Sequence, residues 1–256
     1  KTKKENTMLK AVLFDMGGTL EDVAHTPECN LPCGEKILSY LSSHNIFLDS
    51  GPEEFMRRCE EKYREYRKWG TENHRELSPY EIWSGYYLKD YAVDQEKLRI
   101  IAENLANIWE RNFYTRSMRG ETPELLEQLK KRNIPMGVIS NTASLTHVIE
   151  NLHEMNIHHY FAGCIYLSSL SGYRKPGPRI FIEAAADLGA KPEEAVYVGD
   201  TVSRDVRGAR AAGFLAVIRI NSELTAGSDA GYHTAGEEAD YFVKSLLEIP
   251  PIVDSL

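Results

Sequence analysis

Three carboxylates in this sequence stand at or just after the ends of short apolar runs, which is a pattern typical of a charged catalytic site. Asp15 follows the run AVLF at 11–14. Asp200 comes soon after the run AVYV at 195–198, and Asp205 lies five residues further on. Carboxylates that share a small site repel one another and raise each other's pKa, and a divalent cation relieves that repulsion. Because oxygen ligands favour Mg²⁺ over softer metals, the pattern predicts a magnesium site.

Hydroxyl, amide and amine groups follow two further apolar segments. Ser140 and Asn141 end and follow the run MGVIS, and Lys175 stands in the segment GYRKPGP. If the apolar runs are parallel strands, their carboxyl ends meet at one edge of the sheet, where ligands of open α/β sheets bind. We therefore expect Lys175 to share the site with the carboxylates and to offset part of their charge.

Outside one long insert, apolar runs alternate with amphipathic segments. The apolar runs are too short for helices and indicate buried strands. Strand–helix alternation predicts an α/β fold, a Rossmann-like parallel sheet with right-handed crossovers. The predicted strands are 11–14, 135–140, 164–167, 195–198, 215–220 and 241–243, and the predicted helices are 122–129, 142–151, 178–188 and 206–213. The segment 221–238, rich in Gly, Ala and Ser, is expected to be a mobile loop.

The insert between residues 23 and 115 has a helical pattern without a convincing strand. Apolar residues at helical spacing predict segments at 34–44, 52–69 and 94–112. Another segment opens with Ser78, followed by Pro-Tyr-Glu, which is the signature of a capping box with proline at the first helical position. We expect two domains, an α/β core of residues 1–22 and 116–256 and a helical domain of residues 23–115. Most aromatic side chains of the insert should form its core, and a few should face a ligand.

Composition narrows the possible partners. The 256 residues have a net charge of −8 and 42% hydrophobic residues, which favours a soluble protein and argues against a nucleic-acid surface. No run is long enough to span a membrane, and residues 1–10 lack the apolar stretch of a signal peptide. Four sparse cysteines predict reduced thiols and a cytoplasmic location. The histidines His147, His153, His158 and His159 are expected at the surface or an interface, and the oligomeric state stays open.

Four segments together resemble a known family. DMGGTLED, VISNT, YRKPGPRIF and GDTVSRDVRGARAAGF are similar, in the same order, to the four motifs of the haloacid dehalogenase-like (HAD) hydrolase superfamily. The resemblance covers about residues 10–22 and 120–243, and the insert lies where that family places a helical (C1-type) cap. It implies a Mg²⁺-dependent hydrolase, most often a phosphatase that acts on a small phosphorylated metabolite.

The resemblance also implies a role for each matching residue. Asp15 matches the nucleophile, which attacks phosphorus to form an aspartyl-phosphate and so divides one difficult displacement into two steps. Thr19 matches the residue that steadies the loop after the nucleophile. Lys175 matches the lysine that neutralises the nucleophile and the phosphoryl oxygens. The implied phosphate-binding residues are Gly18, Ser140, Asn141 and Lys175. The implied metal ligands are Asp15, the main-chain carbonyl of Gly17, and Asp200, with Asp205 supporting the metal or its waters.

One position departs from the family pattern. Family phosphatases usually carry a second aspartate two residues after the nucleophile as general acid and base, and this chain has Gly17 there. General acid–base catalysis contributes about 10²–10⁴-fold to a rate, so its loss leaves room for an enzyme that favours leaving groups needing no proton. Glu21 and Asp22 are close enough in sequence to be considered as substitutes.

Three other functions stay open at this point. Family members that hydrolyse C–P or C–halogen bonds also lack the second aspartate. Haloacid dehalogenases resemble a metal-free design, whereas this chain keeps both metal acids, and phosphonoacetaldehyde hydrolases need a cap lysine for a Schiff base. The candidates for that lysine are Lys36, Lys62, Lys68 and Lys89. A non-catalytic binding or regulatory protein is the next alternative, and a phosphomutase fits least because mutases rely on the missing acid.

Overall fold

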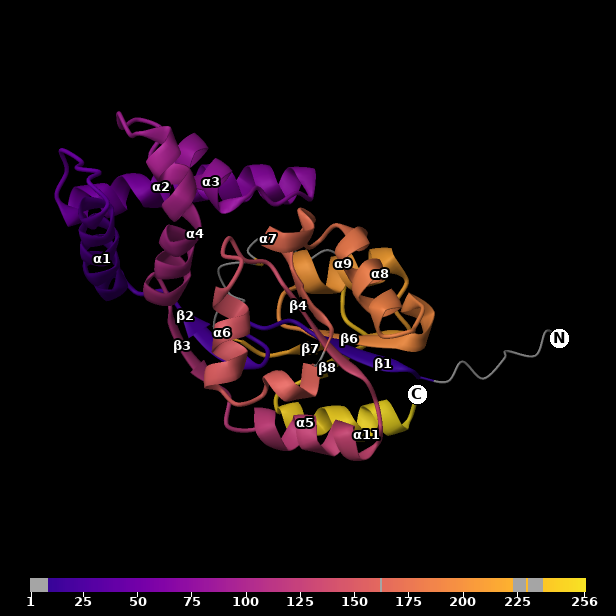
Figure 1. Cartoon of the computed structure of the whole chain (residues 1–256). Coiled ribbons are helices and arrows are strands. Elements are labelled where there is room, and N and C mark those ends of the chain that lie inside the picture. Colours follow the sequence, from indigo (N-terminus) through magenta and orange to yellow (C-terminus); the bar gives the residue numbers. More distant parts are fainter. Residues whose placement is uncertain (1–8, 162, 223–228, 230–236) are drawn as a thin grey trace.

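A six-stranded, fully parallel sheet lies at the centre of the computed structural model, in which residues 9–161, 163–222, 229 and 237–256 are described (Figure 1). The strand order is β5-β4-β1-β6-β7-β8. The strands are β1 (Ala11–Phe14), β4 (Met136–Ser140), β5 (Ile165–Leu167), β6 (Ala195–Gly199), β7 (Ala216–Ile220) and β8 (Tyr241–Val243). The predicted α/β fold class and its six strands are confirmed. Most of the predicted loop 221–238 lies outside the described residues.

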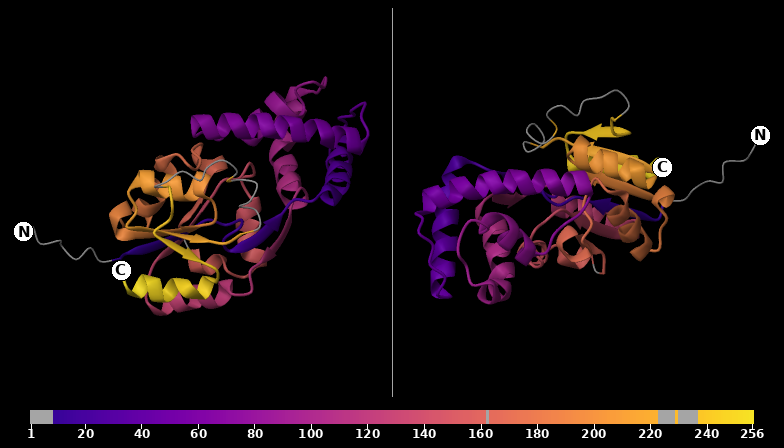
Figure 2. Two further views of the ribbon diagram at one scale, coloured as in Figure 1. Left: turned by 180° about the vertical axis from the view of Figure 1, so that it is seen from behind. Right: turned by 90° about the horizontal axis from the view of Figure 1, so that it is seen from above.

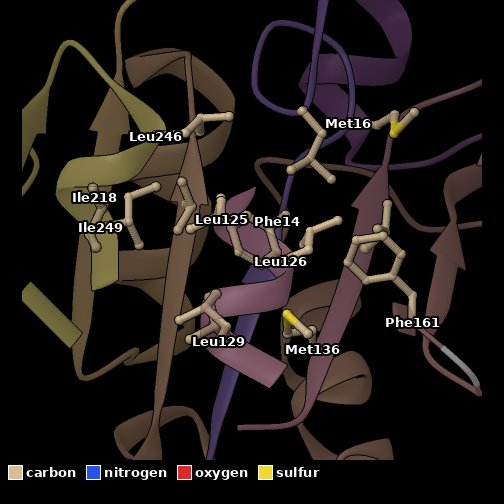
Figure 3. Close-up of a cluster of buried hydrophobic side chains, with 14 of the residues drawn as sticks. Phe14, Met16, Leu125, Leu126, Leu129, Met136, Phe161, Ile218, Leu246 and Ile249 are labelled. Carbon is tan, nitrogen blue, oxygen red and sulfur yellow. The ribbon is translucent and has the colours of Figure 1, made fainter. Parts of the chain in front are cut away.

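Side chains of the strands alternate between two hydrophobic layers, because successive strand residues point to opposite faces. In β1, Val12 and Phe14 join one layer and Ala11 and Leu13 join the other. The first layer packs on α5 (Thr122–Lys131), α6 (His147–Glu154) and α11 (Ile249–Asp254), and the second packs on α8 (Pro178–Asp187) and α9 (Arg207–Ala212). Figure 3 shows the first layer between the sheet and helices α5 and α11. The short helix α7 (Ser168–Ser171) follows β5.

Helices from the insert gather beyond the carboxyl ends of the strands, as both views in Figure 2 show. They are α1 (Asn30–Ser43), α2 (Pro52–Asn73), α3 (Pro79–Ile82) with the π-helical turn Trp83–Tyr87, and α4 (Gln95–Asn112). Their apolar side chains form a hydrophobic cluster separate from the two layers at the sheet. The predicted capping box is present, since Ser78 Oγ accepts from Glu81 N at 3.3 Å and Glu81 Oε2 accepts from Ser78 N at 2.8 Å.

Two strands that the sequence did not predict join the insert to the sheet. β2 (Glu21–Ala24) and β3 (Thr115–Met118) pair antiparallel as a separate ribbon. Their sequences, EDVA and TRSM, are largely polar and half-exposed, so they lack the apolar run that indicates a strand. Backbone hydrogen bonds between the two chain crossings form this ribbon. In the described residues, every helix is too short or too polar to cross a membrane.

Candidate active site

The carboxyl ends of three neighbouring strands bring the predicted acids together. β1 lies between β4 and β6, so Asp15 after β1, Ser140 at the end of β4 and Asp200 after β6 meet at one edge. This is the place where strand order reverses, and ligands of open α/β sheets bind in that crevice. One carboxylate oxygen from each of Asp15, Asp200 and Asp205 lies within 4.8 Å of the other two.

Lys175 is the cation at the centre of this acidic cluster. Its side chain is only 2% exposed, and Nζ donates to Asp15 Oδ1 at 2.5 Å and to Asp205 Oδ1 at 2.7 Å. Nζ also donates to Tyr197 Oη at 3.0 Å, and Tyr197 in turn donates to Asp205 Oδ1 at 2.9 Å. Burial disfavours the ammonium, yet the two carboxylates raise the pKa of Lys175 above its usual range. Lys175 is therefore a fixed positive charge against Asp15.

The pKa values of the three acids are shifted differently because their partners differ. Burial opposes ionisation of Asp205, but Lys175 and Arg204 together lower its pKa to about 2. Burial, with the charges of Asp205 and Asp15, raises the pKa of Asp200 to about 8. Burial also raises the pKa of Asp15, although Lys175 opposes that shift. An extra positive charge beside Asp200 would relieve this repulsion, and a donor set made only of oxygens fits a hard divalent cation such as Mg²⁺.

The loop after β1 approaches the acids closely because Gly18 has no side chain. Gly18 has φ +89°, and a Cβ there would lie 2.3 Å from Asp200 Oδ2, so only glycine fits. Arg119 Nη2 donates to the Gly18 carbonyl at 2.7 Å. Thr19 is fully buried, and its N–H donates to the carbonyl of Met16 at 3.2 Å. These contacts hold the turn between Asp15 and β2.

Gly17, at the position of the missing aspartate, has a different reason to be small. Its φ is not in the left-handed region, and a Cβ would meet Val23 Cγ2 at 3.3 Å and Arg116 Nη1 at 3.6 Å. Glu21 is buried beside it, paired with Arg116 at 2.5 Å, and accepts from Asn151 Nδ2 at 3.0 Å. The space beside Gly17 is therefore occupied by an ion pair from the β2–β3 ribbon.

Neither acid considered as a substitute for the missing aspartate is available. The Glu21 carboxylate is engaged by Arg116, as described above. The side chain of Asp22 is 63% exposed and pairs with Arg119 at 3.0 Å, and Asp22 does not line the cavity over Asp15. A proton for a leaving group would have to come from elsewhere.

Asn141 holds the lysine segment in place. Its Oδ1 accepts from Lys175 N at 2.9 Å, and its Nδ2 donates to the Lys175 carbonyl at 3.0 Å. The Asn141 side chain thus positions Lys175 by binding the backbone of Lys175. The motif alone does not indicate this role. Ser140 lines the cavity beside Asp15 and is 7% exposed. Tyr197 was also missed, although a single hydroxyl within a buried strand run was a usable signal.

A cavity of about 150 Å³ lies between the sheet edge and the insert. One side is the sheet edge with Asp15, Ser140 and Lys175, which we call the sheet wall. The other side, which we call the helical wall, consists of Tyr63, Tyr66, Arg67, Glu76, Tyr87, Trp109, Glu110 and Tyr114. Sequence reasoning predicted aromatic side chains facing a ligand, but not which of them, nor the charged residues among them.

Two carboxylates of the helical wall are already paired. Glu76 is ion-paired with Arg174 at 3.2 Å and accepts hydrogen bonds from Tyr66 and Ser168, and burial raises its pKa to about 7. Glu110 is ion-paired with Arg116 at 3.3 Å. These pairs connect the helical wall to the α/β core.

His147, which the sequence places at the surface or an interface, is buried and does not lie at the surface. Its side chain is 1% exposed, it lines the cavity, and neither ring nitrogen has a hydrogen-bond partner among the described residues. Burial lowers its pKa to about 4, so the imidazole is neutral near pH 7. A single histidine among helical residues has no pattern that distinguishes a cavity position from a surface position.

Comparison with known proteins assigns this fold and site to a family. Residues 9–213 match the family model for haloacid dehalogenase-like hydrolases. The chain belongs to that family and is a hydrolase.

The chain is similar to known phosphatases, and the similarity extends over most of the length of both chains. The chain is 31% identical to the glyceraldehyde 3-phosphate phosphatase of Methanopyrus kandleri over 82% of this chain and 83% of that protein. It is 32% identical to the enzyme of the same name from Methanothermobacter thermautotrophicus, over 85% of this chain and 88% of that protein. A crystal structure of a 2-haloacid dehalogenase from Pseudomonas syringae superposes with a TM-score of 0.66, at 21% identity, over 97% of this chain and 99% of that chain. This last likeness shows the fold alone.

Proposed function

We propose that this hydrolase is a Mg²⁺-dependent phosphatase that cleaves a small phosphorylated metabolite through an aspartyl-phosphate on Asp15. The observation that carries the proposal is the buried cluster at the sheet edge. Asp15 lies 2.5 Å from a fixed ammonium, with Asp200 and Asp205 within 4.8 Å. The phosphatase names of the similar proteins support the substrate class.

The sheet wall supplies the groups for such a displacement. An Asp15 carboxylate oxygen forms a bond to phosphorus while the ester P–O bond breaks, and water later cleaves the acyl phosphate. Lys175 places positive charge beside Asp15 and the phosphoryl oxygens. The Ser140 hydroxyl and the segment at Asn141 and Gly18 border the position of those oxygens. Thr19 stabilises the turn, and the missing second aspartate at Gly17 leaves the alkoxide without a protein acid.

The residues that would hold the ion are the acids and one carbonyl. Asp15, Asp200 and the Gly17 carbonyl are the ligands that we assign, with Asp205 in a supporting role. Asp205 already accepts from Lys175, Tyr197 and Thr201, so its main task is to position the lysine. A bound Mg²⁺ supplies positive charge to the phosphoryl oxygens.

We also propose that residues 23–115 act as a cap domain on a core formed by residues 1–22 and 116–256. The separate hydrophobic cluster of the insert supports this division. The two crossings between the parts are the strands of the β2–β3 ribbon, directly beside the cavity. A cap in this place excludes water from the site when it closes.

The alternatives have less support. A phosphonatase-type Schiff base needs a lysine in the cap, but the described cavity lining contains Lys175 and none of Lys36, Lys62, Lys68 and Lys89. A metal-free dehalogenase has no use for the cluster of Asp15 with Asp200 and Asp205.

The test is a panel of phosphorylated metabolites and artificial esters, assayed with Mg²⁺ and with EDTA. We expect hydrolysis that EDTA reduces by about 10²-fold or more, since a metal ion contributes several kcal/mol of charge stabilisation. Equal rates in EDTA would contradict the magnesium role. Tight binding of a phosphate analogue without turnover of any ester would favour the non-catalytic alternative.

A further inference from the structure

Arg67 of α2 is a cation without an anionic partner in the cavity. Its side chain is half-buried and lines the helical wall. Its guanidinium lies 5.5 Å from the ring centre of Tyr63. Among the described residues it has no carboxylate within ion-pair distance and no hydrogen bond. A guanidinium offers five N–H donors in a planar fork, and charged groups in such surroundings are normally paired.

The other cationic side chains of the cavity form ion pairs or interact with the acidic cluster. The ion pairs are Arg116–Glu21, Arg116–Glu110, Arg174–Glu76, Lys175–Asp15 and Lys175–Asp205. Arg204 donates to Thr201 Oγ1 at 3.3 Å, and its charge helps to lower the pKa of Asp205, so it serves the acidic cluster. Arg67 is thus the cavity guanidinium whose donors the described protein leaves unused.

The groups around Arg67 do not neutralise it. The hydroxyls of Tyr63 and Tyr114 hydrogen-bond to each other at 2.6 Å, and burial raises the pKa of Tyr114 well above its usual value, so that phenol carries no charge. The carboxylate of Glu110 accepts from Ala143 N at 3.0 Å besides its pair with Arg116. An aromatic wall with one unengaged guanidinium suits a ligand that brings its own negative charge.

We propose that Arg67 binds a second anionic group of the substrate, a carboxylate or a second phosphate, while the sheet wall holds the scissile phosphate. This inference rests on the proposed phosphatase function and adds the substrate class. Together with the small-metabolite class proposed above, a second anionic group makes the substrate a small, doubly anionic phosphate ester.

Esters that differ only at the far end of one three-carbon skeleton test this inference. The series is sn-glycerol 3-phosphate, glyceraldehyde 3-phosphate, 3-phosphoglycerate and glycerol 1,3-bisphosphate, of which the first two are neutral at that end. We expect kcat/KM of wild type to be highest for one of the two doubly anionic esters. Comparison of 3-phosphoglycerate with glycerol 1,3-bisphosphate shows whether the second anionic group is a carboxylate or a phosphate. Arg67→Met should lower kcat/KM for the preferred anionic ester about 10–100-fold, as expected for a charged hydrogen bond, and change that for the neutral esters less than threefold.

Two matched variants control for nonspecific effects. Arg67→Lys keeps the charge but loses the planar fork, so it should fall between wild type and Arg67→Met. Arg64→Met removes an arginine of the same helix whose side chain is 66% exposed and lies 3.8 Å from Glu60. This variant should leave kcat/KM unchanged for both the anionic and the neutral esters. The inference is overturned if Arg67→Met lowers kcat/KM equally for all four esters. It is also overturned if wild type has the same kcat/KM for all four.

A binding measurement separates failure of the inference from failure of the proposed function. Calorimetric titration of Asp15→Asn and of Asp15→Asn/Arg67→Met with the same four esters requires no turnover. A 10–100-fold loss of affinity confined to the anionic esters supports the role of Arg67 even if no ester is hydrolysed. If wild type hydrolyses all four esters and both variants bind each ester with equal affinity, the role of Arg67 is overturned and the phosphatase proposal stands.

Discussion

The two walls of the cavity are built on different principles. On the sheet wall, the charged groups are buried and bonded to one another, as in the network of Lys175 with Asp15, Asp205 and Tyr197. Ends of a rigid parallel sheet fix their positions. On the helical wall, aromatic rings dominate, and Arg67 donates no hydrogen bond to any described residue.

This difference separates two tasks. A site in which charges are fixed before the ligand arrives needs little reorganisation during a reaction, which is the condition for electrostatic catalysis. At a wall with an unengaged cation and neutral rings, the binding free energy depends mainly on which ligand binds there. We therefore expect changes on the sheet wall to affect all substrates alike, and changes on the helical wall to alter the ratios between substrates.

The largest expected effect is that of Asp15→Asn on the sheet wall. An amide is not the nucleophile that a carboxylate is, so turnover of every ester should fall by ~10⁴-fold or more, in line with removal of other catalytic nucleophiles. Steady-state assays across the panel measure this effect. Circular dichroism and thermal unfolding of the variant show whether the fold is retained. Near wild-type turnover of any good ester by a folded Asp15→Asn would contradict the aspartyl-phosphate mechanism.

A smaller and selective effect is expected at Gly17, where the two walls meet. Wild type lacks a general acid there, so aryl and acyl phosphates should react much faster than alkyl phosphates. Gly17→Asp should raise kcat/KM for alkyl phosphates by up to about 10²-fold, the lower end of the general-acid effect, and change aryl phosphates little. Rates plotted against leaving-group pKa measure this.

Gly17→Ala is the control for space. The backbone of Gly17 permits a side chain, and a Cβ needs Val23 to give way by a few tenths of an ångström, so this variant should stay within threefold of wild type. A loss in Gly17→Asp but not in Gly17→Ala would show that Arg116 captures the new carboxylate in place of Glu21. Equal losses in both would show that Gly17 is kept for packing.

The sheet and its acids were predictable because their signals are local. Each buried strand, such as 195–199 with its pattern of fully buried residues, appears as an apolar run, and parallel strands must present Asp15 and Asp200 at one edge. The resemblance to HAD motifs supplied the roles expected of these residues. The ribbon at 21–24 and 115–118 was not predictable in this way, since its pairing is non-local and most of its side chains are polar.

The helical wall was not predictable for a related reason. Aromatic residues at helical spacing indicate that a face is buried, but not whether it packs on another helix or borders a cavity. Arg67 lies among residues whose charges pair along the same helix, as Arg57 does with Glu61. Only the three-dimensional arrangement shows that Arg67 has no such partner among the described residues and that His147 is buried at the cavity.

The smallest expected effect concerns His147 and is one of stability. The pKa of this imidazole is about 4 in the folded protein, against about 6.5 in the unfolded chain. The charged groups that face it are Glu110, Arg116, Arg111 and Glu150. As the pH falls below 6.5, the unfolded chain takes up this proton and the folded protein does not. The contribution of the neutral His147 imidazole to the free energy of unfolding is therefore complete above pH 6.5 and is lost progressively towards pH 4.

His147→Leu removes this titration while keeping a side chain of similar size. Between pH 7 and pH 4.5, wild type should lose about 2–3 kcal/mol more of its free energy of unfolding than the variant loses. Urea denaturation at the two pH values measures the difference, and carboxylates that titrate in the same range contribute equally to both proteins. Activity towards the four esters should keep its ratios, because the preference that we assign to Arg67 does not depend on this imidazole. Parallel pH profiles of the two proteins would contradict the lowered pKa of His147 in the folded protein.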